Sequence, residues 1–168
     1  NDIPFATHLP MMVEGVHDFS IYGHVAKANP HWKYFDGSTE TLAILHELHA
    51  YVSPANYQVK IAPTWNYANV HVYGVCKVVK EENKLRDIIE SLAEKYEKNL
   101  IEPWLPEYPD KLLESIVGFE MSVSRIEAKF KLSQNRPEAD RKTIINNFSS
   151  SAKDNEKDVA KLMEENEL

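Results

Sequence analysis

The sequence predicts an α+β fold built around an antiparallel β-barrel, with helices mainly in the later part of the chain. Strand-like segments fill the first half of the chain, and the strongest helical period follows them over Leu85–Tyr96. No regular alternation of strands with helices appears, as a parallel sheet would require. The chain has only five glycines and contains neither a GxGxxG nor a Walker motif, which argues against a Rossmann or P-loop fold.

The bulk composition is typical of one globular domain. The chain has 168 residues, of which 43% are hydrophobic and 27% are charged. This length is enough for one sizeable core and short for two. No apolar stretch approaches the roughly 20 residues that cross a bilayer. Because Cys76 is the single cysteine, an internal disulfide is impossible, and we expect a cytoplasmic protein without membrane attachment.

The net charge restricts the partners. The formal net charge of −7 argues against nonspecific nucleic-acid binding, because that binding depends on Lys and Arg gathered on one face. DNA therefore remains a partner only if it is bound specifically or indirectly. A local basic pocket for a single phosphate is compatible with this charge.

Most of the predicted strands precede residue 80. They are bounded by turn residues and are rich in β-branched and aromatic side chains. The segments are Ser20–Val25, Glu40–His46, His49–Val52 and Val70–Val79. Between the first two, Pro30 interrupts any long helix and predicts a short helix or a turn.

The strongest strand signal covers Val117–Leu132. Its apolar residues occupy odd positions up to Val123 and even positions from Ile126 onward. This change of parity between Ser124 and Arg125 predicts a β-bulge or a sharp bend at a barrel corner, because either would keep one face buried.

The clearest helix follows the strands. Its apolar side chains recur at helical spacing, with Asn83 as the expected N-cap. These side chains are Leu85, Ile88, Ile89, Leu92 and Tyr96. The chain becomes helical and polar again after Pro137, and the segment from about Ser149 predicts an exposed helix.

Four polar and aromatic clusters lie at or beside predicted strand ends. They are PFATHLP (4–10), GHVAKANPHWK (23–33), APTWNYANVHVYG (62–74) and KFKLSQNR (129–136). Together they contain amines, hydroxyls, amides and indole rings. A flat heteroaromatic phosphate ester needs this mixture, because its phosphate requires cations and donors while its ring requires an apolar face and amides for its polar edge.

Other interpretations of these residues stay open. Lysines at strand ends are commonly solvated, tryptophans commonly belong to a core, and asparagines beside proline commonly cap turns. His46 and His49 are expected on opposite faces of a strand, so a metal site that they form with His71 is a lesser alternative and no metal is expected. Cys76 lies in an apolar strand without an evident base and is interpreted as a packing residue.

Six blocks resemble, in the same order, the PaiB family of FMN-binding negative transcriptional regulators. The blocks are PFATHLP, GHVAKANPHWK, HAYVSP, PTWNYANVHVYG, IVGFE and IEAKFKLSQNR, and they span Pro4 to Phe148. The resemblance implies a Greek-key-like antiparallel split β-barrel flanked by helices, similar to that of pyridoxamine-phosphate oxidases. It implies a homodimer, an FMN-binding domain over residues 1–148, and a helical extension of that domain over residues 149–168.

The resemblance also implies which residues bind FMN. The segments with Thr7 and His8 and with Lys27 and Asn29 would border the phosphate and the ribityl chain, and Trp32 offers a wall. Contacts to the ring and from the second subunit would come from Trp65, Asn66, Lys131, Ser133, Gln134 and Asn135. This chain has Glu47-Leu48 where the family usually has Gly-Pro before His-Ala-Tyr.

The function that the resemblance implies is repression of genes for degradative enzymes and sporulation. No helix-turn-helix pattern is visible, so the control of genes is expected to be indirect or highly specific. The alternative is a flavin-dependent oxidoreductase of the pyridoxamine-phosphate-oxidase-like class, and a haem-binding or haem-degrading relative is a lesser one. The sequence singles out no catalytic residue.

Overall fold

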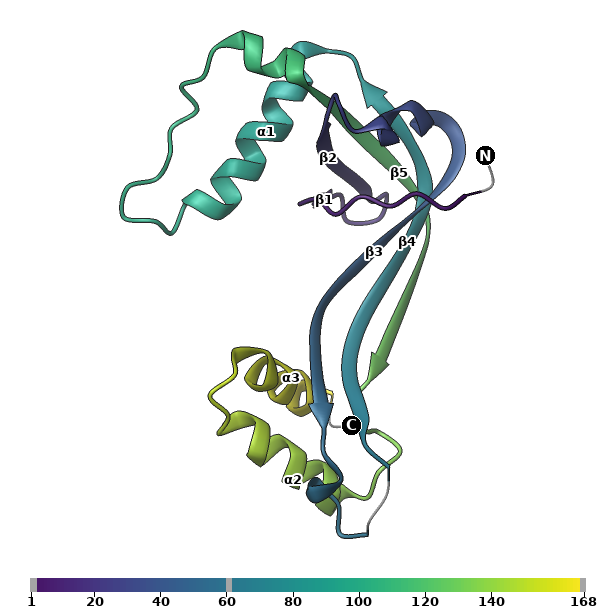
Figure 1. The fold of residues 1–168 in the computed structure, drawn as a ribbon, viewed down its shortest axis with the longest axis vertical. Coiled ribbons are helices and arrows are strands. Elements are labelled where there is room, and N and C mark those ends of the chain that lie inside the picture. The colour runs from purple at the N-terminus through teal and green to yellow at the C-terminus, as the bar shows by residue number, and fades with distance from the viewer. Residues whose placement is uncertain (1–2, 60–61, 167–168) are drawn as a thin grey trace. The chain divides into compact units, whose positions relative to one another are not determined.

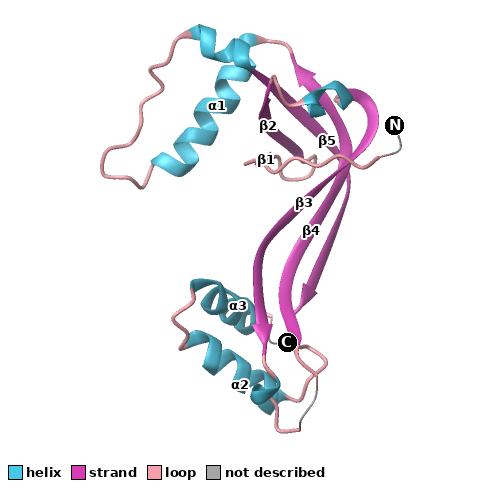
Figure 2. Ribbon diagram, in the orientation of Figure 1, coloured by secondary structure: helices cyan, strands magenta, loops and turns pink. Residues whose placement is uncertain are grey.

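The computed structural model describes residues 3–59 and 62–166, so the outermost residues of the two predicted domain ranges lie outside it. One sheet is formed in the strand order β1-β2-β5-β4-β3, and the pairs β1–β2 and β2–β5 are antiparallel. Its strands are β1 (Met12–Glu14), β2 (Ser20–Ala26), β3 (Asp36–Val52), β4 (Thr64–Val79) and β5 (Ile116–Lys131). Helices α1 (Glu82–Glu97), α2 (Glu138–Ser149) and α3 (Asp154–Glu165) flank it, with short 3₁₀ helices η1 (Pro30–Tyr34), η2 (Pro54–Asn56) and η3 (Asp110–Ser115) (Figure 2). The predicted antiparallel sheet with flanking helices is confirmed.

The contacts of the chain separate into two compact units. Unit 1 comprises Asn1–Leu42 and Tyr73–Arg125, and unit 2 comprises Ala43–Val72 and Ile126–Leu168. Strands β3, β4 and β5 each contribute residues to both units (Figure 1). The predicted division of the chain after residue 148 remains a prediction. Within the described part of the chain, no helix is both long and apolar enough to span a membrane.

The core of unit 1 lies on the paired strands β2 and β5. Their register places Ile21 opposite Met121, and both side chains are buried. Gly23 lies opposite Phe119, where an added Cβ would come within 2.9 Å of the phenyl ring. The absence of a side chain at Gly23 therefore makes room for Phe119, whose ring packs 5.1 Å from that of Phe35.

Helix α1 packs its apolar stripe within unit 1. Ile88 and Leu92 are buried on this stripe, as the helical period predicts. Gly118 of β5 allows the close approach, because a Cβ there would come within 2.7 Å of Leu85 Cδ1. The predicted Asn83 N-cap is wrong: the helix begins at Glu82, and the capping position, Glu81, makes no side-chain capping bond. Glu82 in the first turn instead complements the helix dipole.

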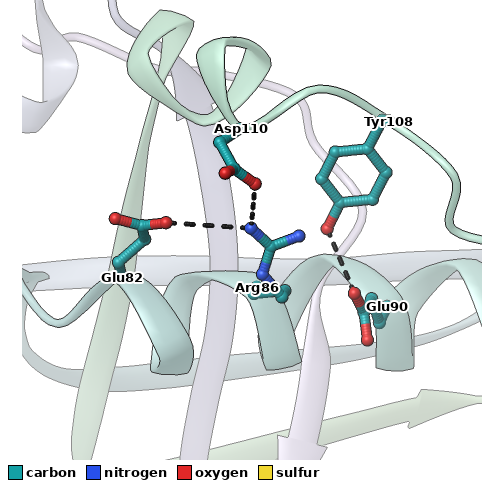
Figure 3. A network of polar contacts seen from close by, with 5 residues as sticks. All are labelled: Glu82, Arg86, Glu90, Tyr108 and Asp110. Carbon is teal, nitrogen blue, oxygen red and sulfur yellow. Dashed lines mark hydrogen bonds and ion pairs between the residues drawn. The ribbon is translucent and has the colours of Figure 1, made fainter.

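A polar network fastens the segment after α1 back onto that helix (Figure 3). The Arg86 guanidinium contacts Asp110 at 2.6 Å and Glu82 at 3.7 Å, and its hydrogen bond to Asp110 raises the pKa of Arg86. The Tyr108 hydroxyl donates to Glu90 at 3.3 Å. The segment between α1 and η3 is thus tied to α1 by polar side chains.

The core of unit 2 is formed by α2 and α3 against the ends of the long strands. Its buried residues are Ala50, Val52, Tyr57, Leu132, Ile144, Ile145, Phe148, Val159, Ala160 and Met163. The predicted helix in the last segment is confirmed, but it is not exposed on all sides. Helix α3 buries three residues of one face, although charged residues cover the rest of it.

The expected pair of short strands before residue 53 is also wrong. Strand β3 runs without interruption from Asp36 to Val52, through the Glu47-Leu48 pair that separates the two predicted segments. The long strand β4 is its neighbour in the sheet, and a paired strand keeps its backbone extended where local propensity is weak.

Strand β5 likewise continues through its change of parity. Phe119 and Met121, at odd positions, are buried in unit 1, whereas Leu132, at an even position, is buried in unit 2. The change between Ser124 and Arg125 coincides with the point at which β5 passes from unit 1 into unit 2. Leu132 directly follows β5, and the residues of β5 from Ile126 to Phe130 are exposed, so the bulge or barrel corner remains a prediction.

Replacing Gly74 with alanine is expected to destabilise the protein. A Cβ at this position would lie 2.2 Å from the backbone oxygen of Ser122 and 3.1 Å from the Val123 Cα, so β4 and β5 would have to separate. We expect a loss of about 1–3 kcal/mol in the free energy of unfolding, measured by urea denaturation. The exposed neighbour Ser122→Ala is the control, and equal stability of both variants would contradict the close approach.

Candidate functional site

The first group of predicted cofactor residues lies in unit 1, where the segment before β1 meets the turn between β2 and η1. The Asn29 Nδ2 donates to Thr7 Oγ1 at 3.1 Å, and the Asn29 Oδ1 accepts the backbone N–H of His31 at 3.0 Å. Thr7 Oγ1 also lies 2.9 Å from His31 Nδ1. We call Thr7, Asn29 and His31 the Thr7 cluster. Asparagine before proline favours such a turn, because its side chain bonds the backbone two residues later.

Lys27 and Trp32 belong to the same turn. The Trp32 Nε1 donates to the backbone oxygen of Lys27 at 3.0 Å, and the Lys27 N–H donates to the Ser115 oxygen at 2.8 Å. The exposed Lys27 ammonium donates to the Glu114 backbone oxygen at 3.2 Å, which leaves further N–H donors for a ligand. His8 follows Thr7 and is exposed. All five predicted residues of unit 1 thus belong to one turn and the segment beside it.

Burial disfavours the charged form of two histidines of this region. Burial lowers the pKa of both His24 and His31. His24 Nδ1 is buried and has no hydrogen-bond partner among the described residues. The His31 ring packs between Phe5, at 5.1 Å between ring centroids, and Phe35, at 5.2 Å. An imidazole in such surroundings accepts or donates a hydrogen bond without carrying a charge.

The second group lies in unit 2, where β4 begins and β5 ends. Asn66 is 0% exposed; its Oδ1 accepts the Ser133 hydroxyl at 2.9 Å, and its Nδ2 donates to Met163 Sδ at 3.3 Å. Ser133 has a φ of 63°, a left-handed conformation that is uncommon outside glycine. The buried amide of Asn66 therefore holds the turn after β5 through the Ser133 hydroxyl.

The remaining predicted residues of unit 2 surround this turn. The Lys131 ammonium donates to Thr64 Oγ1 and lies 5.9 Å from the centre of the Tyr67 ring. Gln134 Oε1 accepts from the Leu132 N–H at 2.8 Å, and its Nε2 donates to the Phe130 oxygen at 2.9 Å. Both polar atoms of the Gln134 amide are therefore hydrogen-bonded to the backbone. The side chain of Asn135 is exposed.

Trp65 offers an open aromatic face in unit 2. Its side chain is 50% exposed, and its ring lies 6.0 Å from that of His49 and 5.7 Å from that of Tyr51. The His49 ring in turn stacks on His46 with centroids 5.0 Å apart. The expectation that these histidines face opposite sides of a strand is therefore wrong, because their rings are in contact.

The described residues contain no group of three or more His, Cys, Asp or Glu side chains that could hold a metal ion. The Cys76 thiol is buried in unit 1, and burial raises its pKa. A raised pKa disfavours the thiolate that nucleophilic or metal chemistry requires, which agrees with a packing role.

The structure gathers the predicted residues into two clusters, one in each unit. Each cluster joins residues that lie far apart in the sequence. The structure also adds residues to them. His31 completes the Thr7 cluster, and Thr64 contacts Lys131. The order Asn29-Pro30-His31 could have indicated His31, since it predicts that the side chain of Asn29 bonds the backbone of His31. No sequence signal indicated Thr64.

Both clusters suit FMN by their donor chemistry. Unit 1 supplies a hydroxyl, an amide and an ammonium for a phosphate, and unit 2 supplies an indole face, a second ammonium and an exposed amide. Asn66 and Gln134 are exceptions, because both ends of each amide are already used within unit 2. Their roles toward the cofactor remain predictions, and the buried Asn66 has a role in folding.

Asn66→Ala is accordingly expected to destabilise the protein even without a ligand. The change leaves the buried Ser133 hydroxyl without an acceptor and should lower the free energy of unfolding by about 2–3 kcal/mol. Urea denaturation of the ligand-free protein tests this. Asn135→Ala, in the same turn but exposed, should change stability by less than about 0.5 kcal/mol; a similar loss in both variants would contradict the assigned role.

Comparison with known proteins connects these clusters to a family. Residues 1–125 match the family described as "Putative FMN-binding domain". The chain is 39% identical over 168 residues to the Bacillus subtilis "Protease synthase and sporulation protein PAI 2", a match that covers 96% of this chain and 81% of that protein.

Two solved structures are similar in fold. The flavocytochrome Anf3 from Azotobacter vinelandii matches with a TM-score of 0.57 at 17% identity, over 78% of this chain and 57% of that one. The FAD and heme binding protein from Mycobacterium smegmatis matches with a TM-score of 0.51 at 12% identity, over 73% of this chain and 58% of that one. This chain thus spans less than two thirds of either structure. By the match of residues 1–125, and by its likeness to the Bacillus protein, the chain belongs to the FMN-binding domain family.

Proposed function

We propose that two copies of this chain hold FMN between them and that the resulting flavoprotein is a PaiB-like negative regulator of transcription. Family membership and the 39% identity to the Bacillus subtilis PAI 2 protein support the cofactor and the regulatory role. The observation that carries the proposal is the complementary chemistry of the two clusters. One suits a phosphate and the other suits a flat ring.

In this proposal the unit 1 cluster binds the phosphate and ribityl end of FMN. Thr7 and Lys27 provide a hydroxyl and an ammonium, Asn29 fixes the position of Thr7, and His8 borders the same segment. Trp32 holds the turn through its bond to the Lys27 oxygen. Charge-assisted hydrogen bonds to phosphate are the strongest contacts available in this set.

The unit 2 cluster binds the ring end. Trp65 presents an open indole face, and Lys131 and Asn135 place polar groups beside the turn after β5. Ser133 and Gln134 fix that turn through Asn66 and the backbone. FMN, when bound, supplies one- and two-electron redox chemistry, and the protein supplies orientation and a tuned environment for it.

The second copy would cover apolar side chains that one copy leaves exposed. On the strands of unit 2 these are Ile44, Tyr51, Trp65, Ile126 and Phe130, each between 43% and 55% exposed. Ile126 and Phe130 occupy even positions, like the buried Leu132, but their side chains are not buried. Exposed apolar side chains on a sheet are typical of an interface, since water contact with them is unfavourable. In this proposal the homodimer completes the barrel and brings a unit 1 cluster and a unit 2 cluster together.

Gene control is proposed to act through the flavin-bound dimer and not through general attraction to DNA. The net charge of −7 opposes nonspecific contact with phosphate backbones. We propose the cytoplasm as the compartment, in keeping with the lone buried thiol of Cys76. The test is a DNA-binding titration of the FMN-loaded protein at several salt concentrations, in which any shift should be confined to particular promoters.

A flavin-dependent oxidoreductase is the second candidate. It is favoured by the stacked His46 and His49 rings beside Trp65, because imidazoles near a ring-binding face can transfer protons. NADH or NADPH added to the oxygen-free, FMN-loaded protein distinguishes the candidates. Rapid bleaching of the flavin absorbance would favour the enzyme, and persistence of the yellow colour would favour the regulator.

Lys27→Ala should weaken FMN binding by roughly 10- to 100-fold, because a charge-assisted contact to the phosphate is lost. Fluorescence quenching of FMN measures this affinity. The exposed Lys80→Ala is the matched control and should bind like the unchanged protein. Riboflavin, which lacks the phosphate, should bind equally to both variants, and unchanged FMN binding by Lys27→Ala would place the phosphate elsewhere.

Phe130→Asp should convert the proposed dimer to a monomer at micromolar concentration, because it buries a charge in an apolar interface. Sedimentation velocity reports the mass. Ile101→Asp is the control, since Ile101 is fully exposed in unit 1 and lies outside the proposed interface. A monomeric parent protein, or a dimer that survives Phe130→Asp, would contradict this interface.

A further inference from the structure

We propose that His31 controls whether Thr7 can donate a hydrogen bond to a phosphate, so that phosphate binding draws a proton from solvent onto His31 Nδ1. The proposal rests on the proposed function, in which Thr7 borders the FMN phosphate, and it goes further by assigning His31 as a positioning residue. It follows from the way in which Asn29 and His31 share the single hydroxyl of Thr7.

The orientation of the Asn29 amide is determined by the backbone. Its Oδ1 accepts the N–H of His31 at 3.0 Å, and an N–H can only donate. The opposite end of the amide, Nδ2, therefore faces Thr7 and donates to its Oγ1 at 3.1 Å. Thr7 thus always accepts one hydrogen bond from Asn29, and only its own hydrogen and one remaining lone pair are left for other partners.

The contact between Thr7 Oγ1 and His31 Nδ1, at 2.9 Å, then has two possible forms. When Nδ1 carries no proton, the Thr7 hydroxyl must donate to it, and Thr7 has no hydrogen left for a ligand. When Nδ1 carries a proton, as it does in the neutral Nδ1–H tautomer and always in the imidazolium, it donates to Thr7, and the Thr7 hydrogen is free to point outward. A phosphate oxygen can only accept here, so its binding favours the second form.

The surroundings of His31 disfavour its charged imidazolium form. Its ring packs on Phe5 and Phe35 and lies 6.5 Å from the Tyr34 ring, and burial lowers its pKa. The other titratable or charged groups of these segments are His8, Tyr34, the cations Lys27 and Lys33 and the carboxylate of Asp36. Asp36 bonds Ser38 and Thr39, and no ion pair joins it to His31 among the described residues.

A bound phosphate reverses this preference. Its negative charge stabilises an imidazolium in the same cluster, and the freed Thr7 hydroxyl adds a donor toward it. By linkage, phosphate binding raises the proton affinity of His31, and protonation of His31 raises the affinity for phosphate by the same factor. FMN should therefore bind more tightly as the pH falls toward 6.

The experiment compares the full chain with its His31→Asn variant. The Asn amide places a group near the Nδ1 position that does not titrate. FMN affinity is measured from about pH 6 to pH 8, a range that includes the ordinary pKa of histidine. Over this range we expect the affinity to fall about tenfold more in the unchanged chain than in His31→Asn. The loss of one proton coupled to binding allows a change of this size. The second ionisation of the phosphate, near pH 6, affects both proteins equally and cancels in this comparison.

Two further measurements complete the test. Riboflavin lacks the phosphate, so the difference in pH dependence between the two proteins should vanish with this probe. Nitrogen NMR of the unchanged, histidine-labelled chain at about pH 7 should show both ring nitrogens of His31 protonated when FMN is added, whereas a change of tautomer would leave one of them bare. This spectrum needs no variant and stands if His31→Asn folds poorly.

The outcomes separate the two proposals. FMN binding with the same pH dependence in both proteins, or with a neutral His31 ring in the complex, overturns the role of His31 and leaves the proposed function intact. A failure of the unchanged chain to bind FMN at any pH overturns both.

Discussion

Three long strands that each contribute residues to two compact units are the constraint on which the rest of this structure depends. Within unit 1, β5 buries Phe119 and Met121, whereas Leu132, which has the opposite parity and directly follows β5, is buried in unit 2. The same division leaves Ile126 and Phe130 exposed in a single copy.

This division also separates the candidate binding residues into two chemical types. The turn after β2 in unit 1 carries the hydroxyl, amide and ammonium groups, and the ends of β4 and β5 in unit 2 carry the indole and the second ammonium. A cofactor with a phosphate at one end and a flat ring at the other needs both sets. A homodimer would bring such sets together without a second kind of chain.

In both clusters, an asparagine amide is fixed before any ligand arrives. Asn29 is oriented by the backbone N–H of His31 and positions Thr7, while Asn66 is buried and positions Ser133. Groups held in this way lose little conformational entropy on binding, which favours affinity. The two asparagines differ in what their loss would do, because Asn66 is enclosed in a core whereas Asn29 lies at a partly exposed turn.

The sequence by itself determined the family, the antiparallel sheet with flanking helices, the α1 helix and the segments that carry the polar clusters. These features depend on local periodicity and on ordered motifs, which are visible along the chain. Only the tertiary structure decided that β3 is one strand, that α3 is packed, and that His46 and His49 stack. It also decided that the Asn66 amide is hydrogen-bonded inside a core and that the His31 ring contacts the Thr7 hydroxyl. Each of these depends on contacts between residues far apart in the chain, which neither spacing nor propensity records.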